Sequence, residues 1–169
     1  MSNIHLLSED TRQKIDSWLK KYPETQKQSA VIPALHIAQE QNEGWLSKEI
    51  IAAVANYLDM PEIAAYEVAT FYSMFDLEPI GKHKINVCTN ISCMLRGSEK
   101  IMEHLKNKLG CNAGETSADG QFIFREVECL GACIGAPMMQ VGKNYYENLT
   151  PERVDEILAQ VKGEQPNGK

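Results

Sequence analysis

Residues 84–93 read KINVCTNISC, and residues 121–133 read QFIFREVECLGAC. Each segment starts with a run rich in β-branched and aromatic residues, which is typical of a strand. Each strand is followed at once by a pair of cysteines. Since parallel strands end at the same edge of a sheet, two such strands would bring both pairs to one place. The two segments therefore predict an α/β domain that carries a four-cysteine site.

The spacing of the cysteines favours a metal centre. The pairs are Cys88-x4-Cys93 and Cys129-x3-Cys133. Structural zinc sites use tight cysteine knuckles, whereas a [2Fe–2S] cluster needs two thiolates on each iron, which suits looser pairs. The plant-type ferredoxin run C-x4-C-x2-C is absent because position 96 is arginine. The spacing thus favours [2Fe–2S] and leaves a zinc site, or four cysteines without a metal, as alternatives.

The chain divides by composition near residue 80. Residues 1–80 carry 6 Lys+Arg against 12 Asp+Glu, and residues 81–169 carry 11 against 11. The first part shows helical apolar periodicity in four stretches, so we expect a helical bundle that serves in docking. These stretches are a helix capped by Ser8 and stopped by Pro23, a helix over 29–42, a helix from Ser47, and a segment from Pro61 to about Phe75.

The second part, residues 81–162, shows the order β-α-β-β-β-α, which fits a thioredoxin-like α/β domain. Its expected elements are a strand over 84–88, a helix over 98–109 ended by Gly110, a strand over 121–129, a hairpin over 138–146 and a helix capped by Thr150. Residues 163–169 are polar and are expected to be a disordered tail.

Charge and hydropathy exclude several function classes. The formal net charge of −6 argues against nucleic acid as a main partner. No apolar run approaches the roughly 20 residues of a membrane span, and the first residues do not form a signal or transit peptide. We therefore expect a cytoplasmic protein that reaches a membrane only through a partner. The chain lacks the G-x-G-x-x-G fingerprint and the P-loop, so a nucleotide or flavin should bind elsewhere.

Several other residues have a structural and a functional interpretation. Arg96 and Lys143 are expected to be solvated surface charges, although either could offset the charge of a cluster. The aromatic run over 69–75 (ATFYSMF) is expected to be core that joins the two halves, with a partner-facing patch as the alternative. The remaining candidates are expected to pack rather than bind a ligand: Cys111, His36, His83, His104, Met138 and Met139.

The cysteine segments and their flanks carry a family resemblance. VCTNISCMLRGSEKIMEHL and ECLGACIGAPMMQVGKNYYENLT closely resemble the 24-kDa [2Fe–2S] subunits of bacterial NADH:quinone oxidoreductase, respiratory complex I. The stretches EGWLSKEIIAAVANYLDMP and YEVATFYSMFDLEPIGKHKI in the first half are also similar. The resemblance covers about residues 10–160.

The resemblance implies a helical bundle followed by a thioredoxin-like domain. It also implies one [2Fe–2S] cluster on Cys88, Cys93, Cys129 and Cys133. It further implies a tight partner subunit that binds FMN and NADH and passes one electron to the cluster, in a complex attached to the cytoplasmic side of the inner membrane. Two alternatives stay open: the equivalent diaphorase subunit of an NAD-linked formate dehydrogenase or hydrogenase, and a zinc or scaffold protein.

Overall fold

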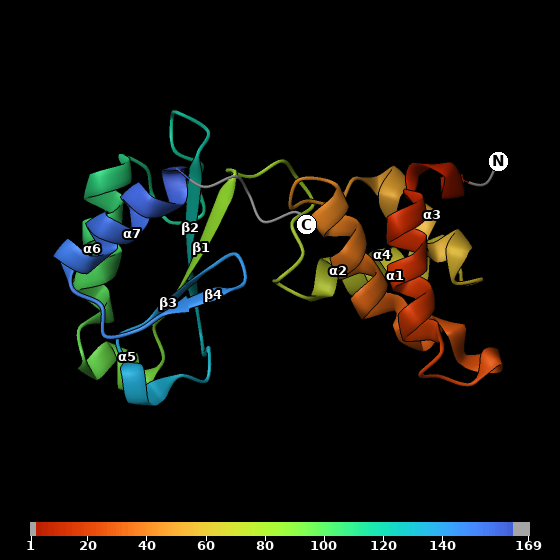
Figure 1. The fold of residues 1–169 in the computed structure, drawn as a ribbon, viewed down its shortest axis with the longest axis horizontal. Coiled ribbons are helices and arrows are strands. Elements are labelled where there is room, and N and C mark those ends of the chain that lie inside the picture. The colour runs from red at the N-terminus through yellow and green to blue at the C-terminus, as the bar shows by residue number, and fades with distance from the viewer. Residues whose placement is uncertain (1–2, 164–169) are drawn as a thin grey trace. The chain divides into compact units, whose positions relative to one another are not determined.

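The computed structural model describes residues 3–163, and the chain forms two compact units, Met1–Pro79 and Ile80–Lys169 (Figure 1). The first unit is helical and the second is built on a four-stranded sheet. This is the α/β class that the sequence predicts. Among residues 3–163, no helix has the length and apolar character needed to cross a membrane.

The first unit contains four α-helices and two short 3₁₀-helices packed on one apolar core. Alanines at its helix contacts are fully buried, which lets the helix axes approach closely. The elements are η1 (Asn3–Leu6), α1 (Glu9–Leu19), η2 (Glu24–Ala30), α2 (Val31–Gln41), α3 (Lys48–Tyr57) and α4 (Glu62–Phe71). The core contains, among others, Ile15, Ala34, Leu35, Ala38, Ile51, Ala53, Val54 and Phe75.

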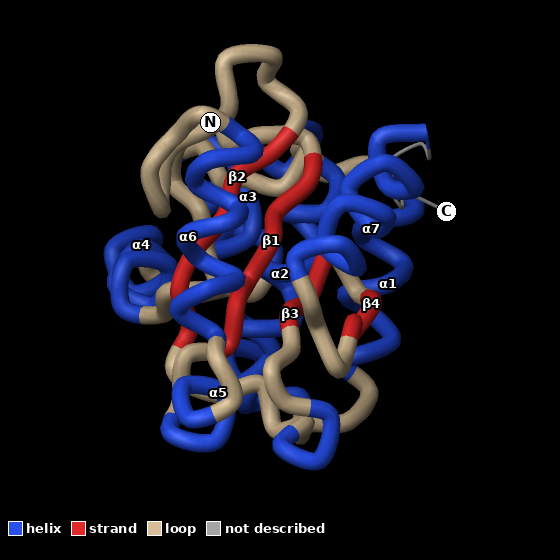
Figure 2. Tube along the Cα trace, turned by 90° about the vertical axis from the view of Figure 1, so that its left-hand side faces the viewer, coloured by secondary structure: helices blue, strands red, loops and turns tan. Residues whose placement is uncertain are grey.

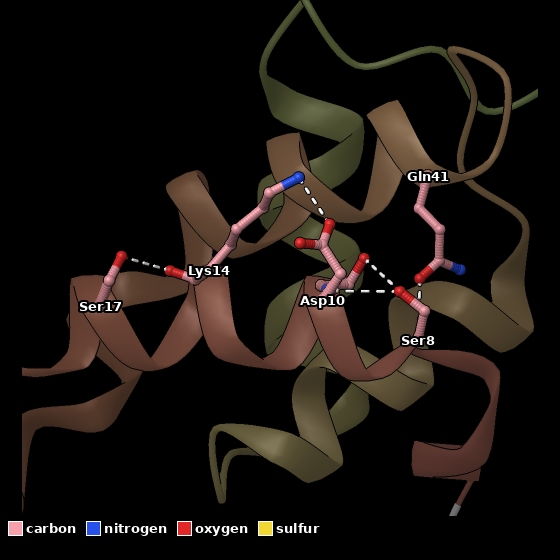
Figure 3. A network of polar contacts seen from close by, with 6 residues as sticks. Ser8, Asp10, Lys14, Ser17 and Gln41 are labelled. Atoms are coloured by element: carbon pink, nitrogen blue, oxygen red, sulfur yellow. Dashed lines mark hydrogen bonds and ion pairs between the residues drawn. The ribbon is translucent and has the colours of Figure 1, made fainter. Parts of the chain in front are cut away.

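Serine caps start two of these helices: the sequence predicts the cap at Ser8, and for Ser47 it predicts only that a helix starts there. The Ser8 hydroxyl accepts a hydrogen bond from the Thr11 N–H at 3.2 Å, and the Ser47 hydroxyl accepts one from the Ile50 N–H at 3.3 Å. Figure 3 shows that Gln41 of α2 reaches the same turn, where its Oε1 accepts the Ser8 N–H at 2.8 Å. These bonds satisfy N–H groups that have no partner inside the helix, and they tie α1 to α2.

The fourth helix differs from its predicted bounds at both ends. Pro61 is the residue before the helix rather than its first residue, and the helix ends at Phe71 rather than near Phe75. Tyr72 has extended backbone angles, which turn the chain out of the helix although the apolar residues continue. Phe75 then enters the core, where His36 packs on it at 4.9 Å between ring centroids.

The second unit contains a mixed sheet in the order β2-β1-β3-β4. Strands β1 and β2 are parallel, and the hairpin of β3 and β4 is antiparallel to β1 through β3. Helices α6 and α7 cover the same face of this sheet, as Figures 1 and 2 show. The elements are β1 (His83–Cys88), α5 (Ile91–Leu95), α6 (Ser98–Leu109), β2 (Phe122–Val127), η3 (Cys133–Gly135), β3 (Met139–Val141), β4 (Asn144–Tyr146) and α7 (Pro151–Gly163).

The core under α6 and α7 follows from strand alternation. Ile85 pairs beside Phe124, and Val87 beside Met139, so these side chains face the same helices. The Thr150 hydroxyl accepts the Arg153 N–H at 3.2 Å and so caps α7 as predicted. Helix α7 extends to Gly163, so the predicted tail does not start there, and residues 164–169 lie outside the described part of the chain.

Asp119 stabilises the turn that precedes β2. Its carboxylate accepts hydrogen bonds from the Ser117 hydroxyl at 2.7 Å, the Lys162 ammonium at 3.0 Å and the Gln121 N–H at 3.1 Å. These bonds lower the pKa of Asp119 to about 2, and the bond from Ser117 contributes most to this decrease. The network ties α7 to the turn that precedes β2, at the strand end opposite to the cysteines.

Candidate metal centre

The four predicted cysteines lie at or after the carboxyl ends of two parallel strands. Cys88 is the last residue of β1 and stands opposite Val127, the last residue of β2. Cys129 follows two residues after β2 ends. The predicted strand over 121–129 is therefore shorter than expected, but both segments leave the sheet at the same edge, as the sequence predicts.

A short helix buries the first pair. The side chain of Asn90 accepts the Ile91 N–H at 2.8 Å and starts α5, a helix that the sequence pattern did not predict. Cys93 lies inside α5 and is 1% exposed, and Cys88 is 4% exposed. The turn from β1 into α5 thus brings the two thiols to the same buried place.

An apolar cluster surrounds these two thiols. Cys88 and Cys93 pack with buried Ala136 and Met138. Leu130 and Ala132, from the loop between the second pair of cysteines, pack against this group. Met138 therefore packs below the loop, as predicted, whereas Met139 lies in the core under α6 and α7.

The second pair lies at the surface. Cys129 and Cys133 are both exposed. The loop between them passes through Gly131, whose φ of 76° lies in the left-handed region that side chains disfavour. Cys133 then opens the single turn of η3. The site thus has a buried half and an exposed half.

The Cys93 thiol interacts with two of the other three. Burial is the main cause that raises the pKa of the Cys93 thiol to about 11, and its hydrogen bond with Cys88 adds to the increase. The charge of Cys133 acts in the same direction. The backbone of Met138 opposes these effects through a hydrogen bond that favours the thiolate. Backbone donors of this kind stabilise cysteine ligands in iron–sulfur sites.

Backbone hydrogen bonds hold the loops around the site. The Cys88 N–H donates to the Met138 carbonyl at 3.2 Å, and the Thr89 N–H donates to the Val127 carbonyl at 3.0 Å. The Thr89 hydroxyl also donates to the Glu126 carboxylate at 2.9 Å. The ends of β1 and β2 and the segment that enters β3 are therefore tied together where the cysteines emerge.

The donor set fits a two-iron cluster. It consists of four thiols that share one sheet edge, with Cys93 near both Cys88 and Cys133. Among residues 3–163, no three or more cysteine, histidine or acidic side chains lie close enough together to bind one metal ion. A [2Fe–2S] cluster takes two thiolates on each iron, which two pairs of cysteines can supply.

The other candidate residues lie outside this group. Cys111 packs at the margin of the core under α6 and α7, where burial raises the pKa of its thiol. His83 is buried and lies 5.5 Å from the Phe122 ring, and His104 bonds to Asp155 at 2.8 Å. Arg96 is exposed at the end of α5, as expected for a solvated charge.

Large apolar side chains around the cysteines face solvent. On α5, Ile91 is 64% exposed and Leu95 is 78% exposed. Ile134, which follows Cys133, is 97% exposed. Met94 completes this group, which we call the apolar rim. Each of these side chains lies within two residues of one of the four predicted cysteines along the chain. Large exposed apolar patches mark protein contact sites.

The aromatic run of the first unit is not uniformly core. Phe71 is 80% exposed and packs edge-on against Tyr72 at 5.1 Å, whereas Phe75 is buried. Phe75 therefore lies in the core of the first unit and Phe71 does not, and the expectation that this run joins the two halves stays a prediction.

Sequence comparisons identify a protein family and several relatives that the chain resembles over most of its length. A family model described as thioredoxin-like [2Fe-2S] ferredoxin matches residues 15–162. A relative from Rickettsia bellii, itself a component of NADH-quinone oxidoreductase, is 50% identical over 146 residues, which are 86% of this chain and 87% of the relative. The mitochondrial NADH dehydrogenase [ubiquinone] flavoprotein 2 of Dictyostelium discoideum is 45% identical over 153 residues, 90% of this chain and 62% of the relative.

Solved structures show a similar fold at low identity. An NAD+-reducing [NiFe]-hydrogenase in the H2-reduced state matches with a TM-score of 0.68 and 20% identity. The match covers 80% of this chain and 22% of the hydrogenase chain. At this identity the similarity concerns the fold alone.

Proposed function

Because the chain belongs to the thioredoxin-like [2Fe–2S] ferredoxin family, we propose that it is the electron-transfer subunit of an NADH:quinone oxidoreductase and binds one [2Fe–2S] cluster. The proposed ligands are Cys88, Cys93, Cys129 and Cys133. The observation that carries the proposal is that both cysteine pairs follow the parallel strands β1 and β2 at one edge of the sheet.

The residues of this chain prepare the site in different ways. When bound, a [2Fe–2S] cluster accepts and returns a single electron, whereas a flavin takes a hydride as two electrons. Apolar side chains pack around Cys88 and Cys93 and bury them, and the backbone of Met138 favours the Cys93 thiolate. Cys129 and Cys133 lie on the exposed side, where an electron donor can approach.

The partner in this proposal is a subunit that binds FMN and NADH. This chain carries no glycine-rich nucleotide fingerprint, so the hydride chemistry belongs to another subunit. The apolar rim of Ile91, Met94, Leu95 and Ile134 supplies a contact surface next to the exposed cysteines. Through this partner the chain would lie on the cytoplasmic face of the inner membrane without entering the bilayer.

Cluster content tests the first part of the proposal. The full chain is expressed together with its oxidoreductase partners and purified without oxygen. We expect about two irons and two sulfides per chain. We also expect an electron paramagnetic resonance (EPR) signal of a [2Fe–2S] cluster after reduction with dithionite. One zinc per chain without iron would contradict the proposal and favour a structural zinc site.

Partner identity tests the second part. We expect the tagged chain to co-purify with the FMN-binding partner and with membrane-embedded subunits of a quinone reductase. Co-purification with a nickel or molybdenum protein instead would assign the chain to an NAD-linked hydrogenase or formate dehydrogenase. The cluster assignment would survive that result, because the same domain serves in both.

A further inference from the structure

The turn that carries Cys133 is held by the segment after β4. The Asn148 N–H donates to the Gly135 carbonyl at 2.7 Å, and the Leu149 N–H donates to the Pro137 carbonyl at 3.0 Å. Gly135 belongs to the same single turn as Cys133. Since a 3₁₀-helix rises about 2 Å per residue, Gly135 lies only about 4 Å along the axis from Cys133.

Glu147 packs directly against this turn. A Cβ atom placed on Gly135 would lie 2.5 Å from both the Cβ and the Cδ of Glu147, and it would also overlap Oε2. Only a glycine permits such an approach. The carboxyl group of Glu147 therefore lies beside the turn of Cys133, and the residue is exposed to solvent.

From this geometry we propose that Glu147 tunes the cluster by charge: its carboxylate lowers the reduction potential of the [2Fe–2S] centre. The inference rests on the proposed function. Reduction adds one electron, supplied by the reduced flavin of the partner, and no bond or proton changes at Glu147. The added negative charge is repelled by the nearby carboxylate, and net charge is one of the factors that set the potential of such clusters.

The other charged residues near the site have different surroundings. The Glu126 carboxylate accepts the Thr89 hydroxyl at 2.9 Å, so its charge is already engaged by a donor. Glu128, Arg96 and Glu147 are all exposed, and the Glu147 side chain lies against the turn η3. This place beside the turn of a proposed ligand makes the charge of Glu147 the one to test.

The size of the effect follows from Coulomb's law. A unit charge at about 10 Å in a water-like medium changes an equilibrium about twofold, and a lower effective dielectric constant increases the change. At a fixed ambient potential and low ionic strength, Glu147→Gln should therefore raise the ratio of reduced to oxidised cluster by about twofold, and by less at high salt, which screens this exposed charge. For a one-electron couple this corresponds to about 18 mV, at 59 mV per tenfold.

The experiment is a redox titration followed by EPR on the assembled complex. Glu147→Asp keeps the charge and should retain the potential of the unmodified protein. Glu103→Gln removes the same charge from an exposed position on α6 and should also leave the potential unchanged. Iron and sulfide are measured in every sample.

Three results would overturn the inference. The first is a Glu147→Gln potential equal to that of Glu103→Gln. The second is an equal shift in Glu147→Asp, which would indicate distortion of the turn rather than loss of charge. The third is iron loss in Glu147→Gln, which would assign the residue to holding the loop. Failure of the proposed function is distinct, because the unmodified protein would then show no [2Fe–2S] signal.

Discussion

Ile134 exposes 97% of its surface at the apolar rim, so the change Ile134→Asp tests whether this rim binds the partner subunit. Burying an isoleucine side chain completely contributes about 1.5–3 kcal/mol. At about 1.4 kcal/mol per tenfold, loss of that burial weakens the complex about 10- to 100-fold. Desolvation of the new carboxylate increases the loss further.

The assay separates partner binding from cluster binding. The dissociation constant for the FMN-binding partner is measured by titration, and the EPR signal of each variant reports whether the cluster is retained. Ala113→Asp is the matched control, because it adds the same charge at an exposed loop residue far along the chain from the four proposed ligands. We expect weaker binding with an unchanged EPR signal in Ile134→Asp, and no change in the control.

Two outcomes would refute the reasoning. If Ile134→Asp and Ala113→Asp bound the partner equally well, the rim would not be the contact surface. If Ile134→Asp lost its cluster, the weaker binding would report damage to the turn of Cys133 and not a lost contact.

Three further predictions concern the site and its support. Cys129→Ser should strongly reduce iron and sulfide content, whereas Cys111→Ser should leave it unchanged; equal cluster content in both variants would refute the ligand assignment. Gly135→Ala should lower cluster retention and thermal stability, because the new methyl group would overlap Glu147; an unchanged melting temperature would show that the turn yields easily. The hydroxyl, ammonium and amide donors around Asp119 lower its pKa to about 2. Ionised Asp119 therefore stabilises the folded state at pH values above its unfolded pKa of about 4. This stabilisation is lost as the pH falls toward the folded pKa of about 2. Asp119→Asn should flatten the decline in stability over this interval, measured by denaturant titration at several pH values, and an unaltered acid profile would count against the network.

The starts of α1, α3 and α7 were predictable because their cause is local, although the equally local asparagine cap of α5 was missed. The hydroxyls of Ser8, Ser47 and Thr150 each accept an N–H three residues ahead, and that arrangement depends on few neighbours. The end of the fourth helix was not predictable in this way. The apolar pattern continues through Phe75, and only tertiary packing decides that the chain leaves the helix after Phe71.

The convergence of the cysteines was predictable from strand direction. Once β1 and β2 are parallel, Cys88 and Cys129 must leave the sheet at the same edge. The features that refine the site come from long-range packing and have no local sequence pattern. The approach of Glu147 to Gly135 joins segments that the hairpin brings together, and the different exposure of the two cysteine pairs depends on the cover from Leu130 and Ala132.

The anchoring of Gly135 by Asn148 also bears on the order of events during synthesis. Domains fold as units, the N-terminal one first, as the ribosome releases them. The helical unit is complete in sequence at residue 79, whereas the turn of Cys133 gains its backbone partners only when residues 148 and 149 have emerged. The ligand turn is therefore secured after the helical unit has emerged, and of the described helices and strands α7 alone comes later in the chain.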